Sequence, residues 1–132
     1  MTQYTHIRNA TGKLTIKNTT FLIDPFLAPK DTYPGFEGTF NYQQRMPIVD
    51  LPLSMDNLLS NVTAVVVTHT HLDHWDDTAI NAIPKSLPIF VQNSADKKPI
   101  SSQGFNDVRK FIKGNNIESH VAVPEDGETI AL

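Results

Sequence analysis

Hydrophobic and polar residues alternate at the start of the chain in the pattern of short β-strands. Turn-forming residues separate the runs: Asn9-Ala10-Thr11-Gly12 lies between the first two, and Asn18-Thr19 precedes the third. Because short turns of this kind join antiparallel neighbours, we expect a meander in which each strand pairs with the next. The predicted strands are residues 4–8, 13–17 and 20–23.

Proline and glycine interrupt this pattern over residues 25–53, which contain five prolines and two glycines. Proline lacks the backbone N–H and blocks helix interiors, so this region is predicted to be a long irregular loop. Loops of this length in a compact domain are usually functional. The aromatic residues of the loop either pack it against the domain or line a substrate pocket, and packing is the expectation for most of them. They are Phe26, Tyr33, Phe36, Phe40 and Tyr42.

From residue 54 onward, helical spacing alternates with apolar, β-branched runs, which predicts helices between strands. Ser54 has the chemistry of an N-cap before a short helix with Leu58 and Leu59 buried, while Asp76 and Asp77 begin a second helix that ends before Pro84. We expect an α/β (α+β) fold, with a mixed β-sheet and flanking helices in a single domain over residues 1–132. The predicted elements are helix 54–59, strand 62–68, helix 78–83, strand 88–92, helix 105–113, strand 117–123 and a strand that starts at residue 129.

Composition narrows the class of protein. The chain is 39% hydrophobic and 19% charged, which is ordinary for a globular domain, and its net charge of −3 gives no footprint for nucleic acid or an anionic membrane. No apolar run approaches the roughly 20 residues of a membrane span, and the N-terminus lacks a signal peptide. We therefore expect a cytoplasmic protein with no nucleic-acid or membrane partner. The absence of cysteine excludes disulfides, thiolate metal sites and cysteine nucleophiles.

Candidate chemistry is concentrated directly after the predicted strand 62–68. His69, His71, Asp73 and His74 fall within six positions. On an extended strand end, residues two apart point the same way, so His69 and His71 can bind one ion, and the turn after them lets Asp73 and His74 face a second. Histidine and carboxylate suit Zn²⁺, in one or two copies, with Mn²⁺ or Fe²⁺ as alternatives. The other interpretations are a loop with chance histidines and histidines that cap the following helix, and the density of the cluster disfavours both.

Such a site predicts a hydrolase. A metal lowers the pKa of bound water toward about 7, which makes hydroxide available at neutral pH. A carboxylate beside the metal can orient that water, so Asp73 is the candidate catalytic residue as well as a ligand. No order of residues indicates a Ser/His/Asp triad, and Thr68 and Thr70 are interpreted as hydrogen-bonding residues of the loop rather than nucleophiles.

The segment Thr68-His69-Thr70-His71-Leu72-Asp73-His74 resembles the His-x-His-x-Asp-His signature of the metallo-β-lactamase superfamily. The segment Phe21-Leu22-Ile23-Asp24-Pro25 resembles the first motif of that superfamily, and residues 8–36 with Trp75-Asp76 resemble its L-ascorbate-6-phosphate lactonase branch. The resemblance implies the N-terminal half of an αββα sandwich. It also implies hydrolysis of a small lactone, ester or phosphoester, the substrate being anionic or an ester.

For individual residues, the resemblance assigns His69 and His71 to a first metal and Asp73 and His74 to a second. Asp24 would hold the motif loop by hydrogen bonds from behind the ligands. From the residues alone, Asp24 is equally well interpreted as a turn residue that ends a strand before proline.

The resemblance also implies ligands that this chain does not show in the expected places. The superfamily uses a further histidine, a bridging aspartate and a late histidine, all in the second half of its sandwich, and the only later histidine here is His120. We therefore expect a partial ligand set and weak metal binding. The alternative function is a non-catalytic half-domain with an incomplete site, acting as a self-associating or interaction module, and a homodimer could imitate the complete sandwich.

Overall fold

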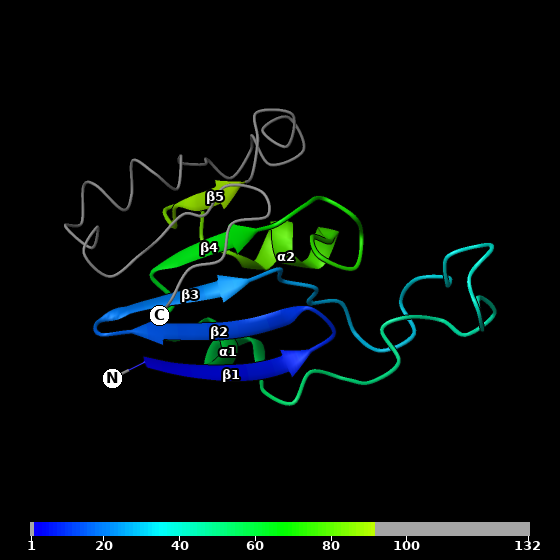
Figure 1. Ribbon diagram of the computed structural model, residues 1–132, viewed down its shortest axis with the longest axis horizontal. Helices are drawn as coiled ribbons and strands as arrows, with labels where there is room; N and C mark the ends of the chain where they lie inside the picture. The colour runs from blue at the N-terminus through cyan, green and yellow to red at the C-terminus, as the bar shows by residue number, and fades with distance from the viewer. Residues whose placement is uncertain (1, 92–132) are drawn as a thin grey trace, which may run out of the picture.

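The computed structural model describes residues 2–91, and its centre is a mixed sheet of five strands in the order β1-β2-β3-β4-β5 (Figure 1). The first three strands pair antiparallel, whereas β4 runs parallel to β3 and β5 runs parallel to β4. The expectation of a mixed sheet with flanking helices is confirmed. The bounds are β1 Thr2–Arg8, β2 Thr11–Ile16, β3 Thr19–Ile23, α1 Met55–Leu59, β4 Ala64–Val67, α2 Asp77–Ala82 and β5 Ile89–Val91. The predicted elements at 105–113, 117–123 and 129 lie outside the described residues.

The meander is confirmed, but its first turn is shorter than predicted. Asn9 closes the turn in the left-handed region, with φ of 49°, and Thr11 and Gly12 already belong to β2. Gly12 pairs with His6, and a Cβ at position 12 would lie 2.5 Å from the Tyr4 hydroxyl oxygen. Glycine is therefore used here because an aromatic side chain covers the backbone, and not because the chain turns.

The hydrophobic core lies on one face of the sheet. Leu22, Val65 and Ile89 form a row across β3, β4 and β5, and all three are fully buried. Leu58 of α1 and Ala79 of α2 belong to the same cluster, so both helices pack on this face. Figure 1 shows α1 behind β1 and β2. Among residues 2–91, neither helix has the length and apolarity needed to cross a bilayer.

The helix predictions hold at their N-termini. The Ser54 hydroxyl accepts a hydrogen bond from the Asn57 N–H (3.3 Å), as expected of an N-cap. Leu59 departs from expectation because it is only partly buried. Strand β4 begins at Ala64, later than predicted, because Asn61 at φ 61° still belongs to the preceding turn.

The loop over residues 25–53 is an arm closed by its own hydrogen bonds. Tyr33 and Met46 exchange two backbone hydrogen bonds of 2.8 Å, and Asp31 N–H donates to Pro47 O at 2.9 Å. The Arg45 guanidinium adds bonds to the carbonyl oxygens of Asp31 (2.8 Å) and Thr32 (2.7 Å). Figure 1 shows the arm extending away from the sheet, beyond the edge where β3 ends.

The aromatic residues of the arm divide into two groups. Phe26 is buried and stacks on Tyr33 with 6.1 Å between ring centroids, as expected of packing residues. Phe36, Phe40 and Tyr42 are exposed, Phe40 to 95%, so the expectation of packing is wrong for these three. They lie in the tip of the arm, whose backbone is satisfied by local turns such as Tyr42 N–H to Thr39 O (3.3 Å) rather than by the domain.

Two buried charged residues fix the base of the arm. The Arg8 guanidinium donates to the carbonyl oxygens of Phe26 (2.8 Å) and Ala28, and also to that of Val49 (2.8 Å) at the other end of the arm. Burial lowers the pKa of Arg8, an effect that the nearby carboxylate of Asp76 opposes. The Arg8 side chain in β1 therefore joins the two ends of the arm, because Phe26 and Val49 lie 23 positions apart in the sequence.

Asp76 completes the base from the other side. Its carboxylate accepts hydrogen bonds from Leu27 N–H (3.3 Å) and Ala28 N–H (2.7 Å), and caps α2 through Ala79 N–H (2.8 Å). The side chain is 1% exposed, and burial raises its pKa above the ordinary value, while its hydrogen bonds and Arg8 act in the opposite direction. The start of the arm is thus fixed between Arg8 and Asp76.

Replacing Asp76 by alanine is expected to lower the free energy of unfolding by about 2–4 kcal/mol, because it removes an N-cap and leaves buried N–H groups without acceptors. Urea denaturation followed by circular dichroism measures this loss. The matched control is Asp77→Ala, an exposed aspartate one position later, for which a loss of only about 0.5 kcal/mol is expected. Equal losses in the two variants would contradict the role given to Asp76.

Candidate metal centre

The parallel pairing of β3 with β4 places two motifs of the sequence side by side. Asp24 follows β3 directly, and its N–H donates to Val66 O at 2.9 Å, which extends the pairing of the two strands by one residue. Thr68 and the histidines follow β4 in the sequence. Figure 1 shows that the carboxyl ends of β3 and β4 lie on the same side of the sheet. Carboxyl ends of adjacent parallel strands are a common position for functional groups. Asp24 and the motif loop are neighbours for this reason, although 44 positions separate Asp24 from Thr68.

The loop after β4 folds back into a tight turn. His71 O accepts hydrogen bonds from His74 N–H (2.9 Å) and Trp75 N–H (3.0 Å), and Trp75 is buried beneath the loop at 4% exposure. The turn brings His74 back toward His69, so that the centroids of the two imidazole rings are 3.8 Å apart.

His69, His71 and Asp73 each direct one ligand atom into a common cluster, with all three atoms within 4.8 Å of one another. Ligands of one tetrahedral zinc ion stand about 3.4 Å apart, so the three atoms would draw closer together on binding it. Asp73 Oδ1 is buried and has no hydrogen-bond partner among the described residues. Two imidazoles and an unpartnered carboxylate oxygen are a donor set that fits a metal ion.

The grouping differs in detail from the predicted pairs. Asp73, assigned with His74 to a second ion, clusters with His69 and His71, while its Oδ2 also lies 3.8 Å from His74 Nε2. Asp73 therefore lies close to all three of the other predicted ligands, His69, His71 and His74. The division of these ligands between one and two ions stays a prediction.

Asp24 has a left-handed backbone (φ 43°), and its carboxylate holds the motif loop. The carboxylate accepts hydrogen bonds from Thr68 N–H (2.7 Å) and from the Thr68 hydroxyl (2.8 Å). Thr68 is thus a hydrogen-bonding residue of the loop, as predicted, whereas Thr70 makes no side-chain hydrogen bond within residues 2–91.

The same carboxylate reaches His74. Asp24 Oδ2 lies 3.0 Å from His74 Nδ1, although the two atoms lack the alignment of a regular hydrogen bond. Because an ionised carboxylate only accepts, the contact favours a proton on Nδ1 and leaves Nε2 for a metal.

Thr11 contributes to this arrangement and was not singled out from the sequence. Its buried hydroxyl donates to Asp24 O (2.7 Å) and accepts from Phe26 N–H (3.0 Å), which holds the backbone on either side of Pro25. Arg8 was likewise interpreted only as a strand residue. The sequence contains no signal for either role, because both depend on contacts with a segment more than ten positions away.

His6 lies in β1, within a predicted strand, and is exposed. His120 falls outside the described residues.

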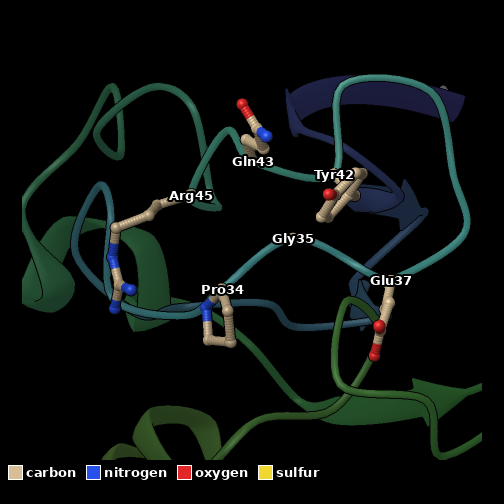
Figure 2. A pocket seen from close by; sticks show the side chains of 6 residues that line it. All are labelled: Pro34, Gly35, Glu37, Tyr42, Gln43 and Arg45. Carbon is tan, nitrogen blue, oxygen red and sulfur yellow. The ribbon is translucent and has the colours of Figure 1, made fainter.

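An open hollow on the arm is a separate feature. The residues that line it are Pro34, Gly35, Glu37, Tyr42, Gln43 and Arg45. Figure 2 shows Gly35 in the middle of the other five. A Cβ at Gly35 would lie 2.3 Å from Tyr42 O, so glycine is needed for the close approach of the two sides of the arm. No motif residue lines this hollow, and it does not form part of the candidate metal centre.

No known protein-family model matches the chain, but one curated protein is similar to it in sequence. The UPF0173 protein YddR of Bacillus subtilis (strain 168) is 46% identical over 124 residues, covering 94% of this chain and 49% of that protein. The chain therefore spans about half the length of this curated relative.

Two solved structures are similar to this chain. One is a possible metal-dependent hydrolase from Veillonella parvula DSM 2008, at 92% identity and a TM-score of 0.77, covering 81% of this chain and 41% of that one. The other is the isothiocyanate hydrolase from Delia radicum gut bacteria, at 46% identity and a TM-score of 0.73, covering 81% and 40%. The chain is thus similar in sequence to a UPF0173 protein, and its mixed sheet with helices matches part of the fold of each of these two structures.

Proposed function

We propose that the protein is a metal-dependent hydrolase whose metal is held by His69, His71, Asp73 and His74. The observation that carries this proposal is the convergence of His69, His71 and Asp73, whose ligand atoms lie within 4.8 Å of one another where β4 ends. Zn²⁺ is the proposed metal, as one or two ions, because imidazole and carboxylate suit it, and Mn²⁺ and Fe²⁺ are the alternatives. The solved structure described as a possible metal-dependent hydrolase supports the same class.

The chain's own residues have separable tasks in this proposal. A bound metal would supply an acidified water and polarise the substrate. Asp73 has one oxygen toward His74 and one without a partner among the described residues, so it can ligate and also accept a proton from water. Asp24 fixes the loop from which the ligands project.

For the substrate, we propose a small molecule with an electrophilic centre open to water. The resemblance to the lactonase branch favours a lactone, ester or phosphoester. The 46% identity to an isothiocyanate hydrolase favours a second candidate substrate, an isothiocyanate, which water would attack at its central carbon. All of these are consumed by attack of water on one activated atom, which is the chemistry that a metal centre of this composition promotes.

The metal site is tested by zinc titration of the chain against a chelating dye. The chain is expected to bind zinc measurably but weakly, because its ligand set is partial. His71→Ala is expected to weaken this binding by more than about a hundredfold, since loss of a ligand exceeds the usual effect of an outer partner. His6→Ala removes an exposed histidine far from the motif in the sequence and serves as the matched control. Unchanged affinity in His71→Ala would refute the ligand assignment.

The same proteins separate enzyme from non-catalytic module. Zinc-loaded chain is incubated with a lactone, a phosphodiester and an aryl isothiocyanate, and product is followed by absorbance. Hydrolysis of one class that is lost in His71→Ala supports the enzyme and identifies its substrate. Tight zinc without turnover of any of the three would favour the interaction module.

The role of Asp24 is tested by Asp24→Asn, which suits the left-handed backbone but replaces one accepting oxygen by a donor. Zinc affinity is expected to fall by about 10–100-fold, the usual effect of losing an outer partner of a ligand. Asp31→Asn is the matched control, because Asp31 also has a left-handed backbone (φ 59°) but is an exposed residue of the arm, so its replacement should leave zinc affinity unchanged. A similar loss in both variants would indicate an effect on folding instead.

A further inference from the structure

We infer that the Thr68 side chain is a positioning residue that fixes the ring of His69 for metal binding, as an extension of the proposed metal centre. Thr68 Oγ1 lies between two groups, 2.8 Å from Asp24 Oδ2 and 3.2 Å from His69 Nδ1. It therefore connects a carboxylate at the end of β3 with a candidate ligand in the loop after β4.

The direction of these two hydrogen bonds follows from counting protons. A hydroxyl has one proton to donate, and an ionised carboxylate can only accept. The contact of 2.8 Å with Asp24 Oδ2 therefore uses the Thr68 proton, and Thr68 Oγ1 has only lone pairs left for His69. The proton between Thr68 and His69 must then come from the ring, so that His69 Nδ1 is the donor.

The alternative direction is disfavoured by the surroundings of Asp24. If Thr68 donated to His69, two oxygen atoms would face each other at 2.8 Å with no proton between them. Asp24 also accepts from Thr68 N–H and lies against His74 Nδ1, which are contacts of an ionised carboxylate.

The consequence for His69 is a defined tautomer. With the proton on Nδ1, the lone pair is on Nε2, which is then the ring nitrogen that His69 can offer to a metal shared with His71 and Asp73. The nitrogen that binds metal is set by the hydrogen bond that the other nitrogen makes. Asp24 therefore orients two histidines by two routes: His74 by direct contact, and His69 through the hydroxyl of Thr68.

The Thr68 hydroxyl thus has a role that the Thr68 backbone does not perform. The Thr68 N–H already ties the loop to Asp24, and it would do so with any side chain at this position. The hydroxyl adds the link to His69, so a change confined to the hydroxyl should alter the ring of His69 and leave the attachment of the loop unchanged.

The test compares Thr68→Val, which keeps the branched shape and removes the hydroxyl, with Thr68→Ser, which keeps the hydroxyl. Thr70→Val is the matched control at the neighbouring motif threonine. Two-bond ¹H–¹⁵N spectra of the metal-free chain at about pH 8.5, where histidine is neutral, report which ring nitrogen carries the proton, and His69→Gln assigns the signal. Zinc affinity is measured in parallel by chelator competition.

In the unaltered chain, in Thr68→Ser and in Thr70→Val, the His69 proton is expected on Nδ1. In Thr68→Val the Nε2–H form should gain population, and zinc affinity should fall by about tenfold. Rescue by serine separates this effect from a general disturbance of the loop. An unaltered chain with the proton on Nε2, or an unchanged tautomer in Thr68→Val, would overturn the inference even if zinc affinity fell.

The two proposals fail differently in this experiment. A tautomer that depends on Thr68 in a chain that binds no zinc would refute the metal centre and support the hydrogen bonds assigned here. Zinc binding that His71→Ala abolishes, with a tautomer independent of Thr68, would support the centre and refute the role of Thr68.

Discussion

The carboxylate of Asp24 is the contact on which the candidate site depends. It stands where β3 ends, and it accepts both the backbone and the side-chain hydrogen bond of Thr68, where β4 ends. Parallel pairing alone brings the two strand ends near each other, but it does not fix a loop that leaves the sheet. Asp24 does so with charge-assisted hydrogen bonds, and the Thr11 hydroxyl holds its backbone in turn. The arrangement explains why an aspartate tolerates a left-handed backbone here: the strained conformation directs the carboxylate at the loop.

The motif loop is held at its other end by a second aspartate. Asp76 binds the N–H groups of Leu27 and Ala28, only a few residues after Asp24. The short segment 24–28 therefore anchors the loop both before His69 and after His74, while Arg8 binds the carbonyl oxygens of the same segment. Burying two opposite charges is costly unless their hydrogen-bonding groups are satisfied. Backbone groups of this segment, together with Val49 O and Ala79 N–H, supply hydrogen bonds to both side chains, whereas Arg8 Nε has no partner among the described residues. The ligands are thus presented by a loop whose two ends cannot move independently.

Local patterns predicted most of the fold and the location of the site. Alternation and turn residues gave the meander, Ser54 and Asp76 marked the helix starts, and the spacing of His69, His71 and Asp73 indicated a metal cluster. The grouping of Asp73 with both histidines was not predictable, because it depends on the turn that returns His74 and Trp75 to His71 O. The roles of Arg8 and Thr11 were not predictable either, since each binds backbone groups far away in the sequence. The exposure of Phe36, Phe40 and Tyr42 shows the same limit: hydrophobicity says that a side chain favours burial, but only the path of the arm decides whether a surface is there to bury it.

The arm and the candidate metal centre share a base, and this bears on how one fold could serve different substrates. The candidate ligands lie on the loop after β4, whereas the exposed aromatic side chains lie at the tip of the arm, and both are attached to the segment bound by Arg8 and Asp76. Residues at the tip make their hydrogen bonds within the arm, so they can change without disturbing the base. Reaction class would then be set by the donors that the sheet positions, and substrate choice by loops that the sheet only supports. For this reason a likeness in fold and motif supports hydrolysis with a metal more strongly than it supports a lactone over an isothiocyanate.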